Sequence, residues 1–182
     1  MATPYYVDVM IRMGDIIHDL HGRLLYLVHK IIIEEKIQLV VSWPDMKAKE
    51  FGFVFRVFGP DETLKKFVLS CQPMVTREMI RVYPISETPP HAKADHYFAR
   101  DRSVEKQTPG YLNRENERCK RRGVQVKTNA NILQEPKKSL YLPLQSGSTE
   151  KRFSIYIKKV SGMAPESSGG NNYGLGLTVP IF

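Results

Sequence analysis

The sequence contains little cysteine and no long hydrophobic run. Only two of its 182 residues are cysteines, Cys71 and Cys119, which is typical of proteins in a reducing cytosol. No apolar run approaches the roughly 20 residues needed to cross a bilayer. The first residues also lack the basic start, apolar centre and cleavage site of a secretory leader. We therefore expect a cytoplasmic, globular protein without a transmembrane segment.

Motifs that bind metal ions are also lacking. The chain has no HExxH or CxxC motif and no cluster of Asp and Glu at metal-ligand spacing. His18, His21 and His29 could share one face of a helix, but no carboxylate or cysteine accompanies them as a further ligand. We expect no metal ion and no other cofactor.

Acidic residues are scarce in one region of the chain, and positive charge accumulates there. Residues 91–159 hold 16 Lys and Arg against 7 Asp and Glu, whereas the rest holds 11 against 12. This segment therefore carries the net charge of +8. Clustered cations favour a polyanion, because their binding to phosphates releases condensed counterions. The pattern indicates a nucleic-acid partner before a membrane surface, with a solvated basic face as the plain alternative.

The first half of the chain alternates between the two-residue period of strands and the spacing of helices. Strand patterns and helix patterns follow one another in the order βαββαβ, at residues 5–13, 16–34, 37–43, 51–59, 61–71 and 79–85. This order predicts a ferredoxin-like module over residues 1–88.

The second half, residues 95–182, has a less regular pattern. A segment with the composition of a linker, residues 86–95, separates it from the first half. The pattern predicts strands at 96–104, 138–144 and 152–160, a charged helix at 112–122 ending before Gly123, and a glycine-rich tail. We expect an α+β protein whose second half carries an arginine-rich helix and binds RNA.

An aromatic strand offers one route to RNA binding. The stretch KEFGFVFR, residues 49–56, is close to the pattern with which RRM domains stack bases on a sheet. Glu50 stands where that pattern has glycine, and Arg56 replaces its last aromatic residue. The first strand adds no aromatic partner, so Phe51, Phe53 and Phe55 fit a sheet with one face in the core better than a base platform.

The charged helix offers a second route. Arg114, Arg118 and Arg121 are spaced by four and three positions, with Arg122 adjacent, so they predict a stripe of guanidinium groups along one face. Arginine suits bidentate contacts to phosphate or guanine. Few apolar residues support this helix, and we expect phosphates to stabilise it.

Four features occur in order along the chain: a histidine late in the first helix, the arginine helix, a QSGST turn followed by Arg-Phe, and a closing YGLGLTVPIF. Together they resemble the repeat-cleaving endoribonuclease of type I-F CRISPR systems over the whole chain. The most specific part is the pair Tyr-Gly-Leu at 173–175 and Val-Pro-Ile-Phe at 179–182. The resemblance implies a metal-independent nuclease that cuts the CRISPR repeat at the 3′ base of its hairpin. It also implies that the enzyme keeps its product as a subunit of the type I-F surveillance complex.

The resemblance also implies roles for single residues. His29 would act on the ribose 2′-hydroxyl, Ser146 rather than Ser148 would position that hydroxyl, and Tyr173 would orient the histidine. Phe153 would stack on the terminal base pair of the stem. Further RNA contacts would come from the arginine helix and from the segment before it, through Arg102, Arg114, Arg118, Arg121 and Arg122.

One part of this correspondence departs from the family pattern. Arg102 fits the arginine that reads bases near the cut, with Arg100 as the alternative in register, but the accompanying glutamine appears as Val104. The extra residues Thr-Pro-Gly at 108–110 also shift the alignment just before the helix. Base reading by this segment is therefore open.

Metal-free RNA cleavage requires deprotonation of a 2′-hydroxyl and protonation of the departing 5′-oxygen, leaving a 2′,3′-cyclic phosphate. Histidine suits both steps because its usual pKa of about 6.5 lies near cellular pH. On the helix pattern alone, His29 is better interpreted as a hydrogen-bonded core histidine, and the residues that carry the resemblance favour catalysis instead. The sequence thus leaves two hypotheses, a repeat-cleaving endoribonuclease and a non-catalytic module that binds an RNA hairpin within a ribonucleoprotein. The two hypotheses differ in the role of His29, which is catalytic in the first and structural in the second.

Overall fold

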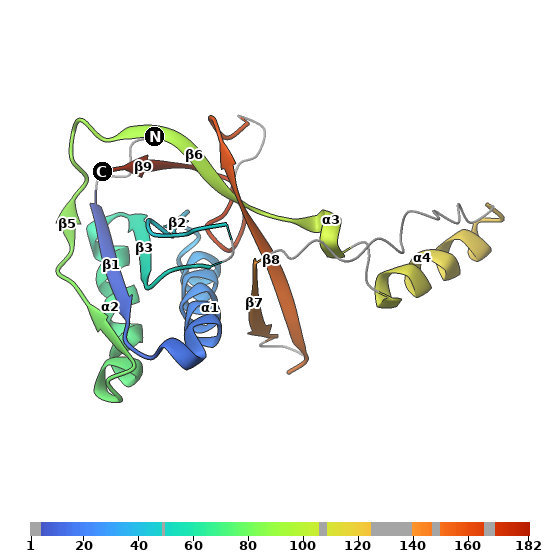
Figure 1. The fold of residues 1–182 in the computed structure, drawn as a ribbon, viewed down its shortest axis with the longest axis horizontal. Helices are drawn as coiled ribbons and strands as arrows, with labels where there is room; N and C mark the ends of the chain where they lie inside the picture. Colours follow the sequence, from blue (N-terminus) through green and yellow to red (C-terminus); the bar gives the residue numbers. More distant parts are fainter. Residues whose placement is uncertain (1–4, 49, 106–108, 125–139, 147–149, 166–169) are drawn as a thin grey trace.

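The computed structural model describes residues 5–48, 50–105, 109–124, 140–146, 150–165 and 170–182. Two antiparallel sheets organise these residues, and the two long helices of the first half pack against the first sheet (Figure 1). The first half contains β1 (Tyr5–Ile11), α1 (Ile17–Glu35), β2 (Val40–Ser42), β3 (Val54–Gly59), α2 (Asp61–Thr76) and β4 (Ile80–Val82). A single turn of 3-10 helix, η1 (Gly14–Ile16), leads into α1.

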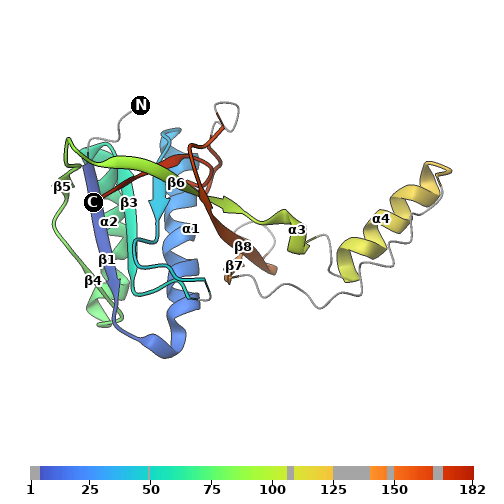
Figure 2. The same cartoon turned by 45° about the horizontal axis from the view of Figure 1, so that its top comes forward.

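The first sheet confirms the predicted order of elements. Its strands lie in the order β2-β3-β1-β4, all antiparallel, which is the strand order of a split βαβ module. The short strand β5 (Ser86–Glu87) also pairs with β1. Alternation along β1 buries Val7, Val9 and Ile11, as the sequence pattern predicts. Both α1 and α2 cover one face of this sheet (Figures 1 and 2).

The aromatic strand contributes to the core rather than to a base platform. Phe51 is 1% exposed and Phe55 is fully buried, and both pack against the indole of Trp43. Phe53, directly before β3, is 51% exposed. One exposed ring lacks the neighbouring aromatic side chains on which RRM domains stack successive bases, so the RRM interpretation loses its basis.

The second sheet is built from β6 (Lys93–Arg100), β7 (Leu140–Gln145), β8 (Arg152–Ser161) and β9 (Thr178–Ile181), in the order β7-β8-β6-β9. The sequence pattern missed two strands of the fold, β5 and β9. Residues 86–95 are not only a linker, because they contain β5 and the start of β6. The tail contains a strand, β9, which pairs with β6.

The predicted strand 96–104 ends early. Asp101 accepts a hydrogen bond from the backbone N–H of Ser103, as an N-terminal cap does, and the short helix α3 (Arg102–Glu105) begins there. Arg102 is exposed on this helix. Val104 is buried and apolar, so it offers no hydrogen bond to a base.

A single hydrophobic cluster joins the two halves. It includes Val9 and Leu24 from the first half together with Phe98, Leu142 and Ile157 from the second sheet. The division into domains at residues 1–88 and 95–182 stays a prediction. None of the helices that the structure describes is both long and apolar enough to span a bilayer.

Helix α4 (Pro109–Arg121) lies away from both sheets in the two views (Figures 1 and 2). It begins three residues before the predicted start, and Gly123 follows it in the left-handed conformation, at φ 63°. From Gly110 to Arg121 every side chain is exposed or half-buried. The helix therefore has little tertiary support and presents its polar side chains to solvent.

Candidate active site

His29 lies on the side of α1 that faces residues 170–182, the closing segment of the chain. Its neighbours Val28, Ile31 and Ile32 are buried in the core, whereas the His29 ring is only partly covered. The ring Nδ1 lies 2.8 Å from the backbone oxygen of Asn172. A carbonyl oxygen only accepts hydrogen bonds, so Nδ1 carries a proton, and in the neutral tautomer of this arrangement Nε2 has the lone pair.

The phenol ring of Tyr173 covers one face of His29. The two ring centroids are 4.3 Å apart and the planes are inclined by 12°, which is a stacked arrangement. Burial raises the pKa of the Tyr173 hydroxyl, the positive charge of Arg100 opposes this shift, and Tyr26 adds to it. The phenol is therefore protonated at neutral pH and can act as a hydrogen-bond donor.

The closing segment is held by backbone and side-chain hydrogen bonds. Asn171 accepts bonds from the backbone N–H groups of Tyr173 and Leu175 through its side-chain oxygen, at 2.9 and 3.1 Å. The carbonyl of Gly174 accepts a bond from the N–H of Val41 in the middle of β2. Gly174 has a φ of 72°, and a Cβ there would lie 3.0 Å from the backbone oxygen of Leu39. Only glycine fits this position without strain.

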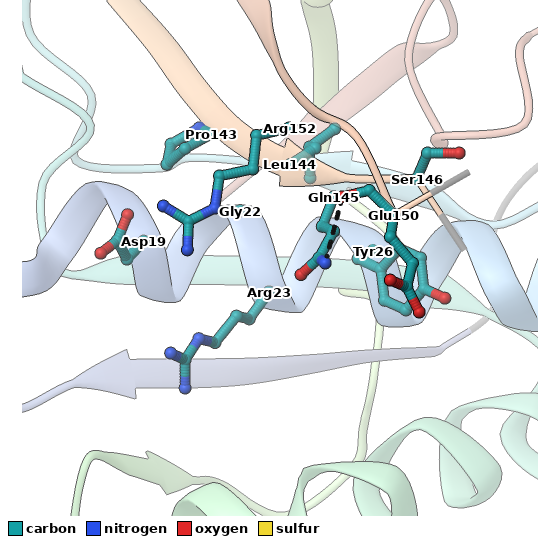
Figure 3. A pocket seen from close by; sticks show the side chains of 10 residues that line it. All are labelled: Asp19, Gly22, Arg23, Tyr26, Pro143, Leu144, Gln145, Ser146, Glu150 and Arg152. Atoms are coloured by element: carbon teal, nitrogen blue, oxygen red, sulfur yellow. Dashed lines mark hydrogen bonds between the residues drawn. The ribbon is translucent and has the colours of Figure 1, made fainter. Parts of the chain in front are cut away.

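The segment between β7 and β8, which contains Ser146 and is called the serine turn below, joins the two strands. The backbone N–H of Ser146 bonds to the carbonyl of Lys151, and its carbonyl accepts from the N–H of Glu150. Ser146 lines a cavity of about 500 Å³ together with Tyr26 of α1 (Figure 3). Ser148 lies outside the described residues, so the choice between the two serines stays a prediction.

Tyr26 connects the two parts of the site. Tyr26 lies about one helical turn before His29 on α1, with the two ring centroids 6.5 Å apart. Its side chain borders the cavity of Ser146. Tyr26 does not stand out in the sequence, because an aromatic residue at helical spacing beside Leu25 and Val28 is typical of a core position. Its spacing of three residues from His29 was the available signal.

The other expected RNA contacts lie on several elements. Phe153, near the start of β8, is 36% exposed, which leaves its ring available for stacking. Arg100, the last residue of β6, acts electrostatically on Tyr173, whereas Arg102 lies two residues later, at the start of α3. Arg100 is thus the arginine with a described link to the histidine site.

The four arginines of the stripe are exposed on α4 or just after it. Arg118 forms a loose ion pair with Glu115 at 3.4 Å, and Arg121 donates to the backbone oxygen of Glu117. Pairs of this kind between exposed side chains on one helix contribute little and exchange readily. The guanidinium groups can therefore turn to phosphates at small cost.

The other histidines of α1 have structural environments. His21 is fully buried, donates from Nε2 to the carbonyl of Gly52 and accepts at Nδ1 from the indole N–H of Trp43. Its burial lowers the pKa to about 4. Nδ1 of His18 donates to the carbonyl of Tyr141. No group of three or more potential metal ligands occurs in the part of the chain that the structure describes.

Comparison with known proteins gives the family. No curated protein matches the chain significantly. The family model described as CRISPR-associated protein (Cas_Csy4) matches residues 6–182, nearly the whole chain. The match spans both sheets, α4, the serine turn and the closing segment. The chain therefore belongs to the Cas_Csy4 family, the endoribonucleases of type I-F CRISPR systems that cleave the repeat in precursor transcripts.

Proposed function

We propose that His29 takes the proton of the 2′-hydroxyl that attacks the scissile phosphate. The observation that carries this proposal is the placement of the ring by two successive residues, Asn172 at its edge and Tyr173 on its face. The bond at Nδ1 selects the tautomer whose Nε2 accepts a proton. A histidine held in this way can later return that proton to the departing 5′-oxygen.

Ser146 and Tyr173 position the reacting groups. The hydroxyl of Ser146 holds the 2′-hydroxyl in line with the phosphate, and fixing a nucleophile in this way can supply much of the rate enhancement. Tyr173 keeps the imidazole plane fixed by stacking. Its raised pKa keeps the phenol neutral, so it does not compete with His29 for the role of base.

The hairpin stem is bound by charge and stacking. The exposed stripe of α4 provides contacts to the phosphates, which set affinity and its salt dependence. Phe153 stacks on the last base pair, and Arg102, or Arg100 in the alternative register, contacts bases near the cut. The side chains that bind the hairpin are thus Arg102, Arg114, Arg118, Arg121, Arg122 and Phe153. After cleavage the protein keeps the product and, together with it, becomes a subunit of the type I-F surveillance complex.

Cleavage of a repeat hairpin in the presence of EDTA tests this proposal. We expect a product ending in a 2′,3′-cyclic phosphate, and we expect His29→Ala to abolish cleavage while hairpin affinity stays within about twofold. His91→Ala, which removes an exposed histidine outside the site, is the matched control and should cleave normally. A wild-type protein that binds the hairpin tightly without cutting it would favour the non-catalytic hairpin-binding module. Loss of both binding and cleavage in His29→Ala would make His29 a structural residue.

A further inference from the structure

The cavity beside Ser146 has features that the proposed chemistry does not use. It is formed by Asp19, Gly22, Arg23 and Tyr26 on one side of α1 and by β7, the serine turn and the start of β8 on the other (Figure 3). Its volume of about 500 Å³ falls within the range of sites that hold one small ligand, about 300–1,000 Å³.

The floor of the cavity is set by a close approach of helix and strand. A Cβ on Gly22 would lie 2.2 Å from the backbone oxygen of Pro143. Gly22 brings the α1 and β7 backbones together. The longer side chains of α1 on either side of it, Asp19, Arg23 and Tyr26, therefore line the sides of the cavity. The cavity is thus built into the packing of α1 against the second sheet.

Arg152 of β8 borders this cavity, whereas Phe153 does not. Arg152 and Phe153 are consecutive in the strand, so their side chains project from opposite faces. Phe153 is proposed to cover the terminal base pair, and a nucleotide beyond the cut therefore cannot continue the stack. That nucleotide has to turn out of the helix, past Ser146.

Two side chains of the lining, which also contains the carboxylates of Asp19 and Glu150, match the chemistry of one unpaired nucleotide. Tyr26 offers an aromatic ring, on which a base of any type can stack with a gain of about 1–3 kcal/mol. Arg152 extends from β8 toward α1 in Figure 3 and offers a guanidinium for a phosphate. Among the residues that the structure describes, Arg152 forms no ion pair that would compete with this contact.

We propose that this cavity holds the nucleotide on the 3′ side of the scissile phosphate, with its base on Tyr26 and its following phosphate at Arg152. The inference rests on the proposed function, because it takes Ser146 and His29 as the place of cleavage. Holding the leaving nucleotide aligns the departing 5′-oxygen with the attacking 2′-oxygen. Tyr26 and Arg152 thus act as positioning residues for the side of the phosphate that leaves.

Substrates with a modified leaving nucleotide test the cavity. In single-turnover cleavage by the full-length protein, an abasic nucleotide directly after the cut should react about tenfold more slowly than the intact hairpin, while an abasic nucleotide three positions further should react normally. The same abasic change in an uncleavable 2′-deoxy hairpin should leave its affinity for the protein unchanged, because contacts to the stem determine the affinity. Equal rates for the intact substrate and the substrate that is abasic after the cut would overturn the inference.

Variants then connect this effect to the cavity. Tyr26→Ala should lower the cleavage rate of the intact hairpin to that of the abasic hairpin, so that the difference between the two rates disappears. Tyr26→Phe, which retains the ring, should retain the difference between the two rates. Arg152→Ala should lower the rate on both substrates about equally, and Lys159→Ala, which removes an exposed cation from the same strand, should leave both rates unchanged. If Tyr26→Ala still discriminates against the abasic substrate, the base is held elsewhere. Failure of the wild-type protein to cleave any hairpin would instead contradict the proposed function.

Discussion

The imidazole of His29 is stacked on the phenol ring of Tyr173, with ring centroids 4.3 Å apart and planes inclined by 12°. The two residues come from opposite ends of the chain, and the second sheet joins them, because β9 pairs with β6 and draws the closing segment over α1. The geometry of the ring therefore depends on the fold of the whole chain. Changes in the closing segment should affect catalysis before they affect binding.

Tyr173→Ala should lower the single-turnover cleavage rate by about 10- to 100-fold, because a displaced imidazole loses its alignment with the nucleophile. Tyr173→Phe keeps the stacked ring and should retain most of the rate. Hairpin affinity, measured with an uncleavable 2′-deoxy substrate, should stay within about twofold for both variants. A Phe variant as slow as the Ala variant would show that the hydroxyl, and not the stacking, matters.

Arg118→Ala and Arg122→Ala should weaken hairpin binding and flatten its salt dependence. Each lost phosphate contact should reduce the slope of log affinity against log salt by about one unit. Fluorescence anisotropy at several salt concentrations measures this slope. Arg77→Ala, which removes an exposed arginine just after α2, is the matched control. An unchanged slope in the α4 variants would remove this helix from the RNA interface.

Periodicity predicted the first half of the fold well, because each strand and helix there buries one regular face. Alternation along β1 and the apolar face of α1 needed no knowledge of distant residues. The second half was harder for a physical reason. Strand β9 contains Pro180 and follows glycines, so its pairing with β6 is a tertiary contact that local pattern does not carry.

The site divides in the same way. His29 and Tyr173 were identified through the resemblance, and the structure brings them together, whereas their roles stay predictions. The contact between Gly22 and Pro143 could not be predicted from the sequence. The spacing of Tyr26 from His29 places the two residues on one side of α1, but it does not show that Tyr26 borders a cavity, since that depends on how closely α1 approaches β7. Alternation predicts a strand at Arg102, but capping by Asp101 starts a helix there.

Gly22→Ala should destabilise the protein by about 1–3 kcal/mol, although alanine normally favours a helix interior over glycine. The reason is the backbone oxygen of Pro143, 2.2 Å from the position of the new Cβ, which cannot turn aside as a side chain would. Gly110→Ala in α4 meets nothing within 4 Å and is the matched control. Urea unfolding should show a loss for the first variant and no loss for the second. Equal stabilities would mean that α1 and β7 are further apart than described.

His21 should make the folded state sensitive to acid. Its pKa is lowered from 6.5 to about 4 by burial, so below pH 6.5 the unfolded chain binds a proton that the folded chain does not. The stabilising contribution is complete above pH 6.5 and is lost as the pH falls toward 4. Between pH 7 and pH 5 the wild-type protein should therefore lose about 2 kcal/mol more free energy of unfolding than His21→Gln, which cannot titrate. Urea unfolding at both pH values measures the difference, and His91→Gln, at an exposed site, should follow the wild type. Parallel losses in the wild type and in His21→Gln would contradict the buried, neutral state of this ring, because a freely titrating His21 would bind its proton equally in both states.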